Sequence, residues 1–277
     1  MEMKSKIDEK QTELMRPDSK IGILGTEDAE GYPHLTFISS LQGLGEEQIS
    51  FGSFSRGESK SNLWERPDAA FLILTAEMEW LKGNARYTHT ENTGTVFEEY
   101  NNKPLFRYNT YFGFAKVYVM DLIRISGIEK LPMPKIIAGA ILTRIFSIFA
   151  AKNEHKILRD TGKALIAKLD GLKFISWHGE DGLLEIEPII QAGPAGTDRV
   201  AFFRLPYGDV TKRIPNGAKA AILCLNLQMQ SVLVKGIYQK SGCLSLLNIE
   251  RVYNSMPPKM EYIYPRADKP LVITDFR

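Results

Sequence analysis

The sequence predicts a mainly β protein of the α+β class, in which two small β domains are joined by a helical segment. Three observations predict this. Short apolar runs separated by turn residues fill the first half, apolar residues at helical spacing fill the middle, and the strand pattern starts again at Leu172. We therefore expect a first domain over residues 1–130, a helical linker over 131–170 and a second domain over 171–277.

The first domain reads as a succession of strands and tight turns. Turn residues at 28–31 lie between two strand-like runs and predict a hairpin, and Pro67 ends a stretch at 59–66 with room for about two helical turns. Strands are expected over residues 21–26, 34–39, 48–51, 69–75, 80–87 and 113–126. Residues 88–112 form a polar and aromatic excursion, whose aromatic side chains we expect in an ordinary core or interface.

The linker predicts two helices with a break near Asn153. Its most hydrophobic stretch, residues 136–151, contains Arg144 and is shorter than the roughly 20 residues that cross a bilayer. We expect no membrane span but a buried or interface helix, with a helix lying on a membrane surface as the alternative. The charged first ten residues lack the apolar core of a signal peptide, so we expect no targeting segment.

Composition and charge argue against several classes of protein. The 277 residues include 35 Lys and Arg against 33 Asp and Glu, a net charge of +2, so we expect no nucleic acid as a partner. Two cysteines, Cys224 and Cys243, are too few for a disulfide scaffold, and a cytoplasmic location is expected. The four histidines show no metal-binding spacing, and no metal is expected.

The second domain repeats the first at an offset of 151 residues. The offset aligns Ile21 to Leu74 without a gap, and 6 of the 26 positions from Ile49 to Leu74 are identical, where chance gives about two. Two extra residues in the next turn bring Lys82-Gly83 onto Lys235-Gly236. Because two copies of one domain can pack as a homodimer does, we expect a pseudo-dimer within the chain, with a further homodimer as an option.

The turn from Gly52 to Asn62 holds most of the chemistry of the first domain. It follows a predicted strand and opens a predicted helix, and its serines, Arg56 and Lys60 suit a phosphate dianion. A solvated polar turn is the alternative. Gly52 and Gly57 have the spacing of a P-loop, but Glu58 stands where the P-loop lysine belongs, which argues against a nucleoside triphosphatase.

Four motifs follow one another along the first domain. They are Gly31-Tyr-Pro-His-Leu-Thr-Phe-Ile38, Ile49-Ser-Phe-Gly-Ser-Phe-Ser-Arg56, Lys60-Ser-Asn-Leu63 with Pro67, and Leu81-Lys-Gly-Asn-Ala85. In this order they resemble the FMN-binding split barrels related to pyridoxamine 5′-phosphate oxidase. The resemblance covers residues 20–126 well and the second copy weakly, and Arg66 and Asp68 depart from the residues that flank Pro67 in that family.

The resemblance implies a split β-barrel of about six strands in each half, with FMN between the two barrels. The residues that it implies for the cofactor are His34, Thr36, Phe37, Ile38, Ser53, Phe54, Ser55, Arg56, Ser59, Lys60 and Asn62. The residues opposite Ser55, Arg56, Lys60 and Ser61 in the second copy are Pro206, Tyr207, Thr211 and Lys212. Because these lack the phosphate signature, we expect one FMN per chain.

The function predicted from the resemblance is that of an FMN-dependent oxidoreductase acting on a small substrate, in which the flavin carries the redox chemistry. No residue stands out as a general acid or base, so no catalytic residue is assigned. A non-catalytic flavin carrier or sensor is one alternative, and the same fold with haem or a deazaflavin is another. A haem would need an axial ligand, for which His34, His89 and His178 are the candidates.

Overall fold

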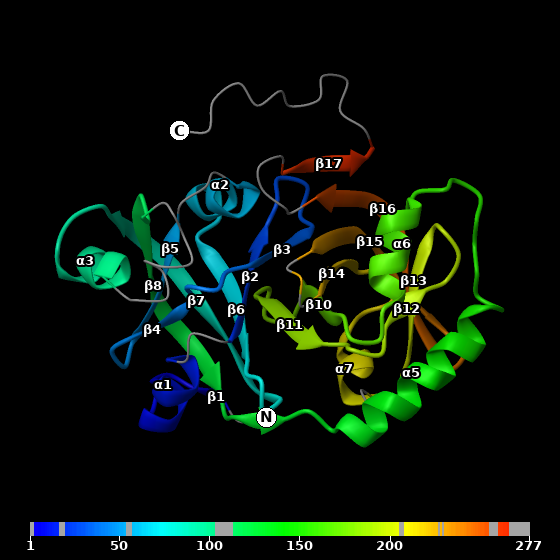
Figure 1. Ribbon diagram of the computed structural model, residues 1–277, viewed down its shortest axis with the longest axis horizontal. Helices are drawn as coiled ribbons and strands as arrows, with labels where there is room; N and C mark the ends of the chain where they lie inside the picture. Colours follow the sequence, from blue (N-terminus) through cyan, green and yellow to red (C-terminus); the bar gives the residue numbers. More distant parts are fainter. Residues whose placement is uncertain are drawn as a thin grey trace. The chain divides into compact units, whose positions relative to one another are not determined.

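Two compact units make up the computed structural model, which describes residues 3–16, 20–53, 57–102, 113–204, 208–226, 228, 230–254 and 260–265. The first unit is formed by Met1–Asp28 with Thr36–Leu131, and the second by Ala29–Leu35 with Pro132–Arg277 (Figure 1). The hairpin tip Ala29–Leu35 therefore belongs to the second unit, although the residues on either side of it belong to the first.

The first unit is built on an antiparallel sheet in the order β3-β2-β6-β7-β8-β5-β4, with β1 beside β8 and β9 beside β7. Its helices are α1 (Glu9–Met15), α2 (Glu58–Glu65) and α3 (Thr95–Asn102). Its strands are β1 (Met3–Lys4), β2 (Ile21–Glu27), β3 (Pro33–Phe37), β4 (Gln42–Leu44), β5 (Gln48–Ser53), β6 (Asp68–Leu74), β7 (Glu79–Glu91), β8 (Lys116–Ser126) and β9 (Glu129–Lys130).

The second unit has its own antiparallel sheet, in the order β11-β10-β14-β15-β16-β13-β12, with β17 beside β16. Its helices are α5 (Met133–Ser147), α6 (Asp160–Ala167) and α7 (Gly208–Arg213). Its strands are β10 (Leu172–His178), β11 (Leu184–Pro188), β12 (Gly193–Pro194), β13 (Arg199–Phe203), β14 (Lys219–Leu225), β15 (Ser231–Ser241), β16 (Leu244–Asn254) and β17 (Glu261–Tyr264).

The two sheets have the same strand order, which confirms the predicted fold class of two split β-barrels in a mainly β chain. Matching β2 to β10 and each later strand of the first path to its counterpart reproduces the second path. Within the parts of the chain that are described, each path has seven strands instead of about six, because the short strands β4 and β12 extend it. The packing of the barrels as a pseudo-dimer and the division at residues 130 and 170 stay predictions.

The strand register corrects one detail of the predicted repeat. Leu74 pairs with Trp80 and Leu225 pairs with Ser231, so the offset of 151 residues continues through this hairpin without the two extra residues. Both copies also carry a bulge at the same place, at Asn84/Ala85 and at Lys235/Gly236. Gly83 and Gly236 each allow a close backbone approach beside that bulge, and this shared requirement produced the misleading Lys-Gly identity.

The excursion after β7 is an insertion in the first copy. Phe51 pairs with Tyr118 in the first sheet, and its counterpart Phe202 pairs with Ser245 in the second. The offset between the two copies is therefore 127 residues at Tyr118 and Ser245, instead of 151, so the first copy has 24 more residues before this strand. Helix α3, which the sequence did not predict, lies in this insertion. Its Tyr100 is buried against Phe114 and hydrogen-bonds Ser50 Oγ at 2.9 Å, which places these two aromatic residues in a core as expected, while the aromatic residues of 103–112 lie outside the described residues.

Replacing Gly83 with alanine is expected to destabilise the first unit by about 2–4 kcal/mol. The added Cβ would lie 2.4 Å from the carbonyl oxygen of Arg124 and 2.5 Å from the ring of Phe71, both inside the sheet. Gly127→Ala is the matched control, because no heavy atom lies within 4 Å of its added Cβ. Chemical denaturation of both variants tests this, and equal stabilities would contradict the packing at Gly83.

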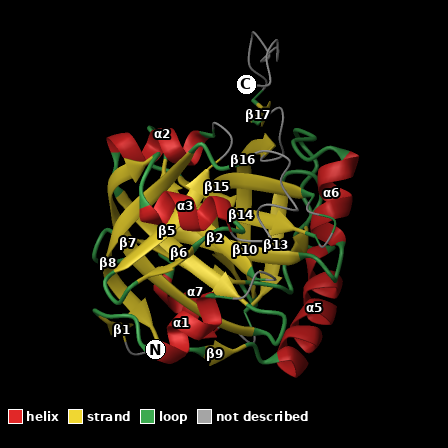
Figure 2. Ribbon diagram, turned by 60° about the vertical axis from the view of Figure 1, so that its left-hand side comes forward, coloured by secondary structure: helices red, strands yellow, loops and turns green. Residues whose placement is uncertain are grey.

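The middle of the chain contains the two predicted helices, α5 and α6, separated by residues 148–159. Both run along the side of the second sheet at β12 and its neighbours (Figure 2). Helix α5 also packs on β13, where Phe203 N donates a hydrogen bond to Thr143 Oγ1 at 2.8 Å. None of the helices described is long and apolar enough to cross a membrane.

Candidate functional site

The turn between β5 and α2 is the site that the sequence predicts for a phosphate. Ser53 ends β5 as a buried residue, and its carbonyl oxygen accepts a hydrogen bond from Ala115 N at 2.9 Å. Gly57 lies directly before α2. Ser55 and Arg56, which the resemblance assigns to the phosphate, and Phe54, which it assigns to the cofactor, lie outside the described residues.

The start of α2 suits an anion. Its N-cap is Gly57, which has no side chain to accept hydrogen bonds from the backbone N–H groups of the first turn. Lys60 lies in that turn and is half-buried. Burial lowers the pKa of the Lys60 ammonium from 10.5 to about 8. A bound anion would stabilise the charged form of this lysine, so the electrostatics favour a negatively charged ligand.

Side-chain hydrogen bonds fix α2 on the sheet. Ser59 Oγ and Thr36 Oγ1 are hydrogen-bonded, which ties the first turn of the helix to β3. Asn62 Nδ2 donates to Thr26 Oγ1 at 3.1 Å, which ties the next turn to β2. Thr36, Ser59 and Asn62 were implied by the resemblance, and all three take part in the contacts between α2 and the sheet. Thr26 was missed, although it is a polar residue at the end of the apolar run predicted as a strand over residues 21–26.

Phe37 and Ile38 are half-buried at the end of β3. The backbone of Ile38 is engaged within the first unit, because its N–H donates to Gly22 O at 2.8 Å and its carbonyl accepts from Leu41 N at 3.2 Å. Its side chain packs against the core of that unit. Ile38 therefore has little left to offer a ligand, whereas Thr36 presents a hydroxyl group beside Ser59.

His34 lies in the part of the hairpin that belongs to the second unit. It is buried and meets the ring of Tyr253 edge-on, with 4.8 Å between the centroids. The ring of Tyr253 in turn packs against that of Tyr262, with 5.1 Å between the ring centroids. The fully buried Lys235 donates a hydrogen bond from Nζ to Tyr262 Oη at 2.8 Å. His34 is thus part of an aromatic and basic cluster of the second unit.

The second unit fills the equivalent place with its own side chains. At the offset of 151 residues, Trp177, Glu185, Glu187 and Arg213 correspond to Thr26, His34, Thr36 and Asn62. Arg213 donates from Nη2 to Glu187 at 2.6 Å, lies 3.4 Å from Glu185 through Nη1, and is stacked 5.7 Å over the ring of Trp177. The Glu187 carboxylate is almost fully buried, whereas about half of the Arg213 side chain is exposed, so the ion pair is partly buried.

The other cations of this region are also engaged. Lys212 pairs with the exposed Asp209 at 3.2 Å, and Thr211, which corresponds to Lys60, is buried. Helix α7 has six residues, against eight in α2. Glu185 and Glu187 alternate along β11 and therefore share one face, a signal that was visible in the sequence but was not used.

The remaining candidates form no second site. Among the residues described, no group of three or more His, Cys, Asp or Glu side chains can hold a metal ion. His89 is exposed and contacts Thr88 Oγ1 at 2.9 Å, and Cys224 is buried with its thiol pKa raised by that burial to about 11. A hollow of about 680 Å³ lies beside Lys6, Glu46 and Asp121, and none of the implied cofactor residues lines it.

No family model matches the chain, and no curated protein matches it significantly. Among solved structures, it is similar to a candidate pyridoxamine 5′-phosphate oxidase from Lactobacillus delbrueckii, with 18% identity over 46% of this chain and 100% of that one, at a TM-score of 0.37. An FMN-binding protein from Syntrophomonas wolfei shows 19% identity over 45% of this chain and 89% of that one, at a TM-score of 0.36. An F420 reductase shows 16% identity over 43% of this chain and 95% of that one, at a TM-score of 0.33. Each similarity covers less than half of this chain. The similar structures include proteins of the kind that the four motifs resemble.

Proposed function

We propose that this chain is an FMN-binding flavoprotein, an oxidoreductase for a small substrate, and that its first unit holds the phosphate of FMN at the turn between β5 and α2. The observation that carries the proposal is the start of α2. The N-cap Gly57 has no side chain that could accept hydrogen bonds from the first-turn N–H groups, and the half-buried Lys60 lies in that turn with a lowered pKa.

The residues of this turn fit a phosphate monoester. Ser53 and Ser59 supply hydroxyl groups at the two ends of the turn, and Lys60 supplies a positive charge. Asn62 acts one step further away, because its amide holds α2 against β2 through Thr26. Arg56 is assigned to the phosphate on its position in the sequence alone.

When bound, a flavin supplies the hydride and electron chemistry, and the chain supplies binding, orientation and the exclusion of water. Thr36 is the group best placed to contact the cofactor from β3, since its hydroxyl already meets Ser59 at the start of α2. We propose the cytoplasm as the location, because Cys224 and Cys243 are both free thiols.

The absorption spectrum of the purified protein tests the proposal. We expect a yellow protein that releases FMN on denaturation, and a colourless protein that does not quench the fluorescence of added FMN would overturn it. A haem or deazaflavin protein would show the different spectrum of that cofactor. Oxidation of a nicotinamide by the purified flavoprotein separates the oxidoreductase from a non-catalytic flavin carrier.

FMN binding is expected to weaken as the pH rises above about 8. In the free protein Lys60 loses its proton near that pH, whereas a bound phosphate raises its pKa, so binding takes up a proton above pH 8. The dissociation constant then rises by up to about tenfold per pH unit. For the same reason the unfolded chain binds more protons than the folded one between about pH 8 and 10.5, and the stability of the free protein rises across that window.

The matched control for this pH dependence is Lys60→Arg, which keeps the positive charge at every pH of the titration. FMN titrations of both proteins from pH 7 to 10 measure the two slopes. The proposal is contradicted if the arginine variant shows the same loss of affinity above pH 8.

A further inference from the structure

Helix α5 and the turn after it present a continuous apolar surface to solvent. Large apolar side chains recur every three or four residues along one side of the helix, where they share a face. Their exposed fractions are 58% for Ile137, 57% for Ile141, 50% for Ile145, 73% for Ile148 and 84% for Phe149. We call these five residues the apolar face. Single exposed apolar side chains are ordinary, but a row of five marks an interaction site.

The opposite side of α5 is fixed to the second unit, so the apolar face cannot turn inward. Ile136, Ala140 and Thr143 are buried, and Thr143 Oγ1 accepts the hydrogen bond from Phe203 N. The ring of Phe146 lies 5.7 Å from that of Phe203. In two views α5 stands at the side of the second sheet, next to β12 and β13 (Figures 1 and 2).

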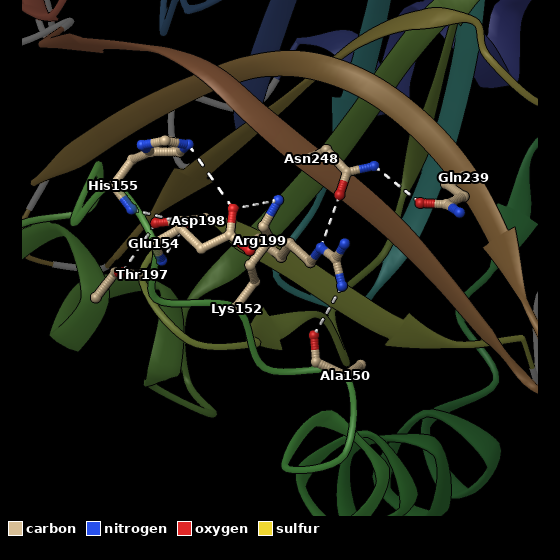
Figure 3. Close-up of polar contacts among 9 residues, drawn as sticks. All are labelled: Ala150, Lys152, Glu154, His155, Thr197, Asp198, Arg199, Gln239 and Asn248. Carbon is tan, nitrogen blue, oxygen red and sulfur yellow. Dashed lines mark hydrogen bonds and ion pairs between the residues drawn. The ribbon is translucent and has the colours of Figure 1, made fainter.

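The chain directly after the apolar face is also held in place, as Figure 3 shows. Arg199 donates from Nη1 to the carbonyl of Ala150 at 3.2 Å. The carboxylate of Asp198 accepts hydrogen bonds from the backbone N–H groups of Glu154 at 2.8 Å and His155 at 3.0 Å. Ile148 and Phe149 therefore lie in a turn whose flanking segments are both hydrogen-bonded to the second unit.

Positive charge is concentrated in the segment of the second unit that carries this face. Residues 132–168 contain seven Lys and Arg and two acidic residues, an excess of five, whereas the whole chain has an excess of only two. The basic residues are Lys135, Arg144, Lys152, Lys156, Arg159, Lys163 and Lys168, and the acidic ones are Glu154 and Asp160. Helix α5 itself contains no acidic residue. We call the seven basic residues the cationic rim.

We propose that the apolar face and its cationic rim dock on the surface of an anionic lipid bilayer. The apolar side chains would enter the boundary between headgroups and acyl chains, and the cations would bind the anionic headgroups. A helix of 15 residues is too short to span a bilayer but can lie in its surface. The proposal does not depend on the flavin site.

Charge complementarity favours a bilayer over a second copy of the chain. In a twofold contact the same face meets itself, so each rim cation would approach the cations of the other copy. An anionic bilayer instead attracts every Lys and Arg near its surface. The face thus fits a planar negative surface better than the same face of a second copy of the chain.

Co-flotation of the full chain with vesicles tests the proposal. We expect binding to equimolar phosphatidylcholine and phosphatidylserine, weaker binding to phosphatidylcholine alone, and a loss of binding as salt rises. Ile148→Glu with Phe149→Glu should weaken binding by at least about tenfold. Lys135→Ala and Lys156→Ala, which leave the apolar face intact, should each weaken it about fivefold.

The matched control is Trp64→Glu, which places the same charge on a large apolar residue that is 61% exposed in the first unit. It should bind the anionic vesicles as the unchanged chain does, and thermal unfolding checks that all variants are folded. Failure to float with anionic vesicles, or equal flotation of the Ile148/Phe149 variant, would overturn the proposal. So would a concentration-dependent dimer that only this variant abolishes, in a chain that does not bind vesicles.

Discussion

Replacing Lys60 with alanine is expected to weaken FMN binding by about 10- to 150-fold, which corresponds to roughly 1.5–3 kcal/mol for a charge-assisted hydrogen bond. The lysine lies in the first turn of α2, where burial disfavours its charged form and lowers its pKa. Riboflavin, which lacks the phosphate, should bind the variant and the unchanged protein equally well. Titration of both flavins into the apoprotein, followed by fluorescence quenching, measures the two affinities.

Arg56→Ala is expected to have an effect of the same size, on the strength of its place in the turn. The control for both variants is Lys212→Ala, because Lys212 lies in the corresponding helix of the second unit and its ammonium pairs with the exposed Asp209. It should leave the affinity for FMN within about twofold. Equal losses for FMN and riboflavin, or an equal loss in the Lys212 variant, would rule out the phosphate role of Lys60.

Arg213→Ala should destabilise the second unit by about 1.5–3 kcal/mol. It removes the partner of the buried Glu187 carboxylate and the cation over Trp177. Because half of the arginine is exposed, we expect less than the full cost of breaking a buried pair. Denaturant unfolding measures the loss, and the affinity of the folded protein for FMN should stay unchanged.

A double variant separates the ion pair from the packing around it. Glu187→Thr with Arg213→Asn introduces the residues that stand at these positions in the first copy, and it removes both charges together. It should cost less stability than Arg213→Ala alone, because no unpaired carboxylate remains buried. If the single and double variants are equally unstable, the ion pair does not account for the effect.

Much of the fold could be predicted from the sequence because strand and turn signals are local. The strands at 21–26 and 69–75 and the restart at Leu172 were placed within one residue, and the offset of 151 residues predicted the common strand order. The register after β14 was misjudged, since a Lys-Gly identity outweighed the pairing that sets it. Helix α3 was missed although Val96, Phe97 and Tyr100 have helical spacing, because the helix has only eight residues and lies in a polar segment.

The candidate site was predicted less completely, for the same physical reason. Serine and lysine in a turn signal anion binding locally, but the bond between Asn62 and Thr26 spans 36 residues and depends on the sheet. The pair of Arg213 with Glu187 spans 26 residues and likewise follows from the fold. The sequence showed only that the second copy lacks the phosphate signature. The structure adds that charged side chains occupy the equivalent place in the second unit, which is a stronger reason to expect one FMN per chain.

The ratio of FMN to protein tests the central claim most directly. The account predicts one FMN per chain, bound at the turn of the first unit, because Arg213, Glu185, Glu187 and Trp177 pack together at the equivalent place in the second unit. The measurement is the FMN released on denaturation of the fully loaded protein, divided by the protein concentration from amino-acid analysis. A ratio near one, falling toward zero in the Lys60→Ala, Arg56→Ala double variant, is the expected result. A ratio near two, or a ratio near one that the double variant leaves unchanged, would contradict the account.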